Sequence, residues 1–249
     1  MNVRMKKIVN TLGIPRLIII GLLIVILIAM PILGLQIEML YTQAFGRIGM
    51  YMVLVLAMVP AIESGIKMNM ALPLGILCGL VGSVISLEVG ASGWTGLFLF
   101  VGLMCFLVWL FMRSKLGIIM KTAGANPAFA NATGINVDRM RILGMMLSTI
   151  LGAIGIIVYA QSYGFFQYYM APLNMAFIAV AAILIGGATV NRAGIFNVIL
   201  GTILYQSIMT FTLPIANVIM PEGSLSEIVR IIIQNGIILY ALTKAGESR

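Results

Sequence analysis

The chain contains no histidine, and it has only seven acidic residues among its 249 positions. Histidine is the commonest metal ligand and general base, so its absence excludes every Ser-His and Cys-His dyad. The two cysteines, Cys78 and Cys105, both lie inside apolar runs, which is typical of small buried thiols and not of a disulfide framework. The residues therefore predict neither a catalytic centre nor a site for a metal or a cofactor.

Phosphate-binding motifs are missing as well. The chain has no Gly-x-x-x-x-Gly-Lys-Ser/Thr loop and no Gly-Lys pair anywhere. The net charge of +8 could suggest nucleic acid, but the basic residues stand at the ends of apolar runs instead of clustering on one polar face. We therefore predict no nucleic-acid partner, and any ATP hydrolysis must occur in another subunit.

Apolar residues dominate what remains: 61% of the chain is hydrophobic, 9% is charged, and the mean hydropathy is +1.13. A water-soluble core does not need so much apolar sequence, so the excess must face lipid or other buried helices. Because about 20 apolar residues cross a bilayer as a helix, the chain is predicted to be all-α. We expect one transmembrane domain over residues 1–249, a polytopic membrane helical bundle of about eight transmembrane helices.

Apolar stretches with few or no charged residues mark the expected spans. Their predicted bounds are 17–35, 48–62, 68–87, 93–112, 142–161, 174–190, 194–220 and 225–243. The first resembles a signal peptide because basic residues precede it. However, residues 17–37 are uncharged for 21 positions, longer than the apolar part of a signal peptide, so we expect this span to be retained.

The basic residues are distributed unequally between the two sides of such a bundle. Thirteen of the 15 fall on the side of the termini, and only Arg47 and Arg230 fall on the other. Cytoplasmic segments of membrane proteins carry the excess of Lys and Arg. Both termini and the polar loop at residues 113–141 are therefore expected in the cytoplasm.

The loop at residues 113–141 has helix signals of its own. Asn126 is a good N-cap, Pro127 is a good first helical residue, and Gly134 is a good terminator. A helix this short is marginal alone in water, and Phe129 is its only bulky side chain. It is either a knob that docks into another protein or a plain connection packed on its own spans.

The loop resembles a segment of the permease subunits of bacterial ABC importers of the simple-sugar, nucleoside and branched-chain amino-acid type (type II importers). The shared pattern is Gly-x-Asn-Pro-x-x-Ala-x-x-x-Gly-Ile-Asn, and the matching positions are Gly124, Asn126, Pro127, Ala130, Gly134, Ile135 and Asn136. A second, weaker match to the family's Leu-Gly-Gly-Thr segment comprises Gly186, Gly187, Ala188 and Thr189. In that family the loop is the coupling helix that contacts the ATPase, which implies the same role for these residues and for Phe129.

The resemblance also implies partners and a location. They are a cytoplasmic ABC ATPase, a second permease subunit (identical or different), an extracytoplasmic solute-binding protein and the lipid of a bacterial cytoplasmic membrane. The implied cargo is a small polar solute, with a simple sugar favoured and a nucleoside or a branched-chain amino acid as alternatives. The N-terminal half differs from the family, because Lys67 replaces the acid of its Gly-Ile-Asp-Leu-Ser segment and about two spans fewer are present.

Polar side chains within the spans are candidates for a solute path. These are Asn174, Asn197, Gln206 and Asn235. Each could equally form a hydrogen bond between helices. Glu63 and Lys67, four positions apart at a span end, are expected to form a solvated ion pair.

Two other functions remain open. One is a membrane scaffold, or a degenerate permease, that assembles with other subunits without transporting. The other is a secondary transporter, which would need acids embedded in the membrane for ion coupling. The seven acidic residues here stand at span ends or in loops, which disfavours the secondary transporter.

Overall fold

The protein is described by a computed structural model that covers residues 14–66, 94–163, 170–189 and 192–219, with isolated positions in 73–76 and 228–239. These residues form helices, and one isolated antiparallel pairing joins Thr189 to Arg192. The helices are α2 (Ile14–Ile32), α3 (Ile37–Leu56), α4 (Met58–Glu63), α6 (Trp94–Arg113), α7 (Lys115–Ala125), α8 (Pro127–Ala132), α9 (Val137–Tyr163), α10 (Met170–Ile185) and α11 (Ile195–Ile219). The all-α prediction is confirmed.

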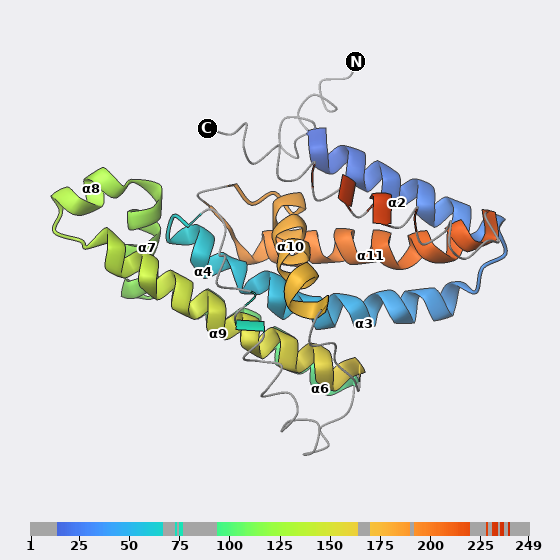
Figure 1. The fold of residues 1–249 in the computed structure, drawn as a ribbon, viewed down its shortest axis with the longest axis horizontal. Coiled ribbons are helices and arrows are strands. Elements are labelled where there is room, and N and C mark those ends of the chain that lie inside the picture. Colours follow the sequence, from blue (N-terminus) through green and yellow to red (C-terminus); the bar gives the residue numbers. More distant parts are fainter. Residues whose placement is uncertain are drawn as a thin grey trace.

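Helices α2, α3, α9 and α11 run lengthwise through the bundle, as Figure 1 shows. Helix α11 packs against α3, α2 and α10, whereas the opposite side of α3 packs against α9 and α6. The short helices α7 and α8 project at one end, beyond α4, as Figure 1 shows. This end of the bundle carries the loop that the sequence singled out.

The core lies along α3 and α4. Residues 53–62 are all buried, and Leu54, Val55 and Leu56 have no exposed surface. A helix that is apolar all round is stable only when other helices or lipid surround it. In the continuous stretch Ile37–Glu63, 83% of the most apolar window is covered by the protein itself. This stretch is therefore the central span.

Three described helices are long and apolar enough to cross a membrane: Ile37–Glu63, Val137–Ser162 and Ile195–Ile219. A fourth candidate is the pair Val101–Arg113 and Lys115–Ala125, which is bent by 73°. Helices α2 and α10 are apolar but shorter. Most of the predicted spans 68–87 and 225–243 lies outside the described residues.

The second span begins earlier than the sequence predicted. We expected residues 48–62, but the helical stretch begins at Ile37 and includes Glu38 and Arg47. The prediction treated both charges as marks of a loop. Glu38 instead lies in the first turn, where the positive end of the helix dipole stabilises an acid, and Arg47 is half-buried within α3. Arg47 is therefore not a residue of an external loop.

Residues 113–141 also contain more helix than expected. Helix α7 was not predicted, although Ser114 is a strong start signal. The Ser114 hydroxyl oxygen accepts a hydrogen bond from the Gly117 N–H at 3.3 Å and caps α7. Helix α9 begins at Val137, five residues before the predicted position 142. The loop is thus a compact helical unit.

Two glycines permit close contact between α10 and α11. A Cβ atom at Gly201 would collide with the carbonyl oxygen of Ala182, and a Cβ atom at Gly186 would collide with the carbonyl oxygen of Asn197. Small residues at such crossings let membrane helices approach backbone to backbone. The Gly186-Gly187 pair therefore belongs to a tightly packed corner between the two helices.

Replacing Gly201 with alanine should destabilise the bundle by about 1–3 kcal/mol or more, because the added methyl group meets main-chain atoms that move only with the helix. Gly102→Ala is the matched control, since no atom lies within 4 Å of its added Cβ. Thermal unfolding in detergent, monitored by size-exclusion chromatography of samples heated to increasing temperatures, should show a lower midpoint temperature for Gly201→Ala only. Equal midpoints would contradict the packing at this corner.

Candidate functional site

Helix α8 has defined signals at both ends. The Asn126 side-chain oxygen accepts a hydrogen bond from the Phe129 N–H at 3.1 Å, and Pro127 occupies the first turn. At the other end Gly134 has φ +82°, and the Ile135 N–H donates to the Ala130 carbonyl at 2.9 Å. This is a Schellman motif, which requires the left-handed conformation that glycine adopts without strain. The predicted short helix is confirmed.

One side of α8 packs against its own chain. Ala130 is fully buried in a small cluster with Ala123 of α7 and Val137 of α9, and Ile135 and Met140 cover this cluster. Six residues cannot hold a helix in water alone. The two caps and this contact supply the missing order, so α8 is held in place before any partner binds.

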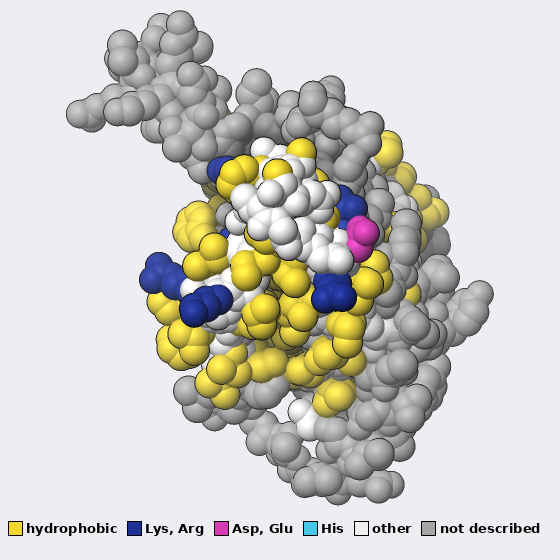
Figure 2. All heavy atoms as spheres, turned by 90° about the vertical axis from the view of Figure 1, so that its left-hand side faces the viewer, with side chains coloured by type: hydrophobic (Ala, Val, Ile, Leu, Met, Phe, Trp, Pro, Cys, Tyr) yellow, Lys and Arg dark blue, Asp and Glu magenta, His cyan; other side chains and the backbone are white. Residues whose placement is uncertain are grey.

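The other side of α8 is exposed. Phe129 leaves 56% of its surface uncovered, and Ala128, Asn131 and Ala132 are exposed beside it. Figure 2 looks onto this end of the molecule, where uncharged atoms occupy the front, several basic side chains lie around them and one acidic side chain is visible. The exposed basic residues of this region are Arg113, Lys115, Lys121 and Arg139. An exposed aromatic side chain, Phe129, that is surrounded by basic residues forms a surface suited to contact with another protein.

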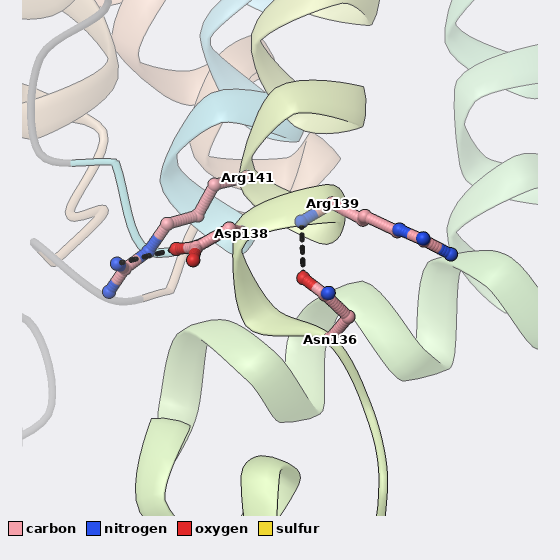
Figure 3. A network of polar contacts seen from close by, with 4 residues as sticks. All are labelled: Asn136, Asp138, Arg139 and Arg141. Carbon is pink, nitrogen blue, oxygen red and sulfur yellow. Dashed lines mark hydrogen bonds and ion pairs between the residues drawn. The ribbon is translucent and has the colours of Figure 1, made fainter.

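Residues 133–136 connect α8 to the first turn of α9, whose polar contacts are shown in Figure 3. The Asn136 side-chain oxygen accepts a hydrogen bond from the Arg139 N–H at 3.0 Å and caps α9. Asp138, in the same turn, lies 3.8 Å from Arg141. Both asparagines of the sequence pattern, Asn126 and Asn136, therefore act as helix caps.

Helix α7 meets the end of α4 through main-chain atoms. A Cβ atom at Gly124 would collide with the Glu63 carbonyl oxygen and would lie 2.8 Å from the Gly65 nitrogen. Gly65 has φ +85° and ends α4, with the Ile66 N–H donating to the Ala61 carbonyl at 3.0 Å. The first glycine of the pattern, Gly124, thus lies where α7 touches the end of the central span Ile37–Glu63.

The environment of Glu63 differs from the prediction. We expected a solvated ion pair with Lys67, which lies outside the described residues. Glu63 is instead buried, with 8% of its surface exposed. Its Oε1 accepts a hydrogen bond from the Ala193 N–H at 2.8 Å, across 130 positions of sequence. The prediction of a solvated carboxylate was wrong because it considered only neighbours along one helix, whereas this hydrogen-bond partner lies in the segment between α10 and α11.

The candidate path residues do not gather at one place. Gln206 is buried within α11, and Asn197 is half-buried in the first turn of the same helix. Nine helical positions separate them, a distance of about 14 Å along the axis. Asn174 and Asn235 are exposed. A path through all four remains a prediction, and Gln206 is the member that lies inside the bundle.

Sequence reasoning overlooked other polar groups beside Gln206. Thr210 and Thr212 are buried on α11, and the Thr210 hydroxyl has no hydrogen-bond partner within the described residues. Their position in a long apolar helix was the available signal, because polar groups inside a membrane are costly. Within the described ranges no group of three or more His, Cys, Asp or Glu residues could hold a metal ion.

Similar proteins come from bacterial transport systems. Over 84 residues the chain is 31% identical to the guanosine ABC transporter permease protein NupQ of Bacillus subtilis, which covers 33% of this chain and 26% of that protein. Over 81 residues it is 32% identical to the nucleoside ABC transporter permease protein NupC of Lactococcus lactis subsp. cremoris, and this alignment covers 32% of this chain and 26% of that protein. A tyrosine transport system permease protein of Clostridioides difficile is 29% identical over 108 residues, covering 42% and 36%. No solved structure matches the chain.

Each alignment therefore spans about a quarter to a third of the curated relative. The family described as "Branched-chain amino acid transport system / permease component" matches much more of the chain, residues 7–241. This match includes every described helix from α2 to α11. The chain thus belongs to the family of branched-chain amino acid transport system permease components, which comprises ABC importer permeases of the sugar, nucleoside and amino-acid type.

Proposed function

We propose that this chain is the transmembrane permease subunit of an ABC importer and that it moves a small polar solute across the bacterial cytoplasmic membrane. One observation carries the proposal. Helix α8 is capped at both ends and packed on one side, yet it leaves Phe129 56% exposed on the other. An exposed aromatic side chain on a pre-ordered helix is typical of an interface anchor.

The partner for this surface is a cytoplasmic ABC ATPase, because the chain has no nucleotide-binding motif of its own. The exposed basic residues around α8 support a cytoplasmic location for this end. In the topology predicted from the sequence, both termini lie on the same side. A second permease subunit, identical or different, and an extracytoplasmic solute-binding protein complete the proposed importer. The residues of this chain that are proposed to couple it to the ATPase are Gly124, Asn126, Pro127, Phe129, Ala130, Gly134 and Ile135. Phe129 makes the contact with the ATPase, and the others hold Phe129 in position.

The mechanism follows from how α8 is attached. Helix α8 packs on α7 and α9, and α7 packs on α4. Closure of the ATPase on α8 would therefore displace the ends of α4 and α9, and the spans would tilt around a central solute site. A scaffold that only assembles with other subunits is the rival function, and it would bind the same partner without carrying solute.

The solute is the least constrained part of the proposal. The sequence resemblance favoured a simple sugar, whereas two of the three relatives are named for guanosine or nucleosides and one for tyrosine. All these solutes are polar, and the buried amide of Gln206 could hydrogen-bond any of them. We take a nucleoside as the first solute to test.

Phe129→Asp should abolish recovery of the ATPase with the tagged chain. A charge placed on the exposed apolar anchor should weaken the contact by at least about 2 kcal/mol, or more than tenfold. The measurement is purification in mild detergent from the native membrane, with ATPase subunits identified by mass spectrometry. Phe129→Leu, which keeps an apolar side chain, should retain the ATPase. Equal recovery with Phe129→Asp and the parent would exclude α8 as the contact.

Asn126→Ala should weaken the same contact less strongly. Loss of an N-cap costs about 1 kcal/mol of helix stability, so the ATPase should be recovered at a level several-fold lower. Asn126→Asp is the matched control, because its carboxylate can still accept from the Phe129 N–H. If the alanine variant behaves like the aspartate variant, the order of α8 does not contribute to binding.

Deletion of the gene should lower uptake of labelled guanosine, and the parent chain should restore it. Cells that carry Phe129→Asp at equal membrane abundance should not recover uptake, because the variant no longer binds the ATPase that powers transport. Labelled ribose and labelled tyrosine serve as comparison solutes in the same cells. Loss of ribose uptake alone would favour the sugar prediction, and unchanged uptake of all three would favour the scaffold.

A further inference from the structure

Glu63 lies where three segments of the bundle meet. It is the last residue of α4, and its side chain is 8% exposed. Its carboxylate accepts a hydrogen bond from the Ala193 N–H at 2.8 Å, two residues before α11 begins. Its own carbonyl oxygen lies against Gly124 of α7, at a point where no side chain separates the two backbones.

These contacts form a stiff connection. Main-chain contacts such as that between Gly124 and α4 leave no side chain whose rotation could absorb a displacement. On the other side, Thr189 and Arg192 pair through their main chains at 2.9 Å and 3.4 Å, so the segment before α11 is closed on itself. The hydrogen bond from the Ala193 N–H to Glu63 joins the α7–α4 contact to the segment before α11. The connection therefore runs from α7 through α4 to the start of α11.

The hydrogen bond is well suited to hold this connection. A buried main-chain N–H without an acceptor is costly, and bonds to a charged acceptor are stronger than neutral ones. Lys121 of α7 and Arg192 interact electrostatically with the carboxylate, so both neighbouring segments also carry a compensating charge. Glu63 is therefore hydrogen-bonded to the segment before α11 through its side chain and lies against α7 through its main chain.

We propose that Glu63 is a positioning residue of the transport cycle, which transmits displacement of the coupling segment α7–α8 to α11 through its hydrogen bond to Ala193. This inference rests on the proposed function, because the displacement comes from the ATPase. Helix α11 carries the buried polar residues around Gln206. Glu63 would thus connect ATP hydrolysis with the part of the bundle that is suited to contact solute.

The test uses a reporter at the far end of α11. In the intact complex, purified with its ATPase, Cys78 and Cys105 are replaced by serine and Ile219, which is 62% exposed, is replaced by cysteine. The rate of labelling by a thiol reagent is measured without nucleotide and with ATP plus vanadate, which traps the closed ATPase. The variants are Glu63→Ala, Glu63→Gln and, as a matched control, Glu38→Ala, which removes an exposed acid from the same span.

In the parent and in Glu38→Ala, nucleotide should change the labelling rate. In Glu63→Ala the ratio of the two rates should fall to about one, because the two sites are no longer coupled. ATPase recovery and ATP hydrolysis should persist in this variant. Glu63→Gln should retain the change in rate, because the amide oxygen can still accept from Ala193. If Glu63→Ala does not accumulate, Glu63→Asp, whose shorter side chain withdraws the acceptor, should reduce the ratio in its place.

Three results would overturn the inference. The first is a nucleotide-dependent rate in Glu63→Ala, or in Glu63→Asp where that variant takes its place, equal to that of the parent. The second is a parent complex that holds its ATPase but shows no nucleotide-dependent rate at residue 219. The third is a parent that recovers no ATPase at all, and this result alone would also reject the proposed function.

Discussion

Main-chain groups at helix ends must find hydrogen-bond partners, and this requirement governs the end of the bundle where α4, α7 and α8 meet. Helices α4 and α8 both end in a Schellman motif, at Gly65 and Gly134. The starts of α8 and α9 are satisfied by the side chains of Asn126 and Asn136. With these groups paired, short helices can pack close together with fewer unpaired main-chain groups.

The same requirement explains the sequence pattern residue by residue. Asn126, Pro127, Gly134 and Asn136 determine where helices begin and end. Gly124 and Ala130 are small for a different reason, since one touches the backbone of α4 and the other fills a fully buried position. Phe129 is outside the pattern, yet it is the bulky exposed group of α8. The residues of the pattern therefore determine the position and the ends of α8, whereas the exposed side chain that α8 presents, Phe129, is not part of the pattern.

Much of this architecture could be predicted from the sequence because its signals are local. Hydropathy located α2, α6, α9, α10 and α11 to within a few residues, and three cap residues located α8. Local signals misled us at Arg47, because a charge inside a span resembles a loop when the packing around it is unknown. The partner of Glu63 could not be predicted, since Ala193 is 130 positions away and contributes only its main-chain N–H. Any residue type except proline would supply that donor, so the sequence carries no trace of the contact.

The self-contained character of residues 124–136 has a consequence for how such proteins can diversify. This segment carries its own start and stop signals and rests on one small cluster of side chains. The polar interior around Gln206 depends instead on packing among long helices. Because the two regions draw on different residues, substitutions in α11 can change the proposed solute contacts while α8 keeps its shape. If α8 binds the ATPase as proposed, one kind of ATPase can serve permeases for chemically different solutes, and residues 124–136 can be exchanged between such permeases as a unit.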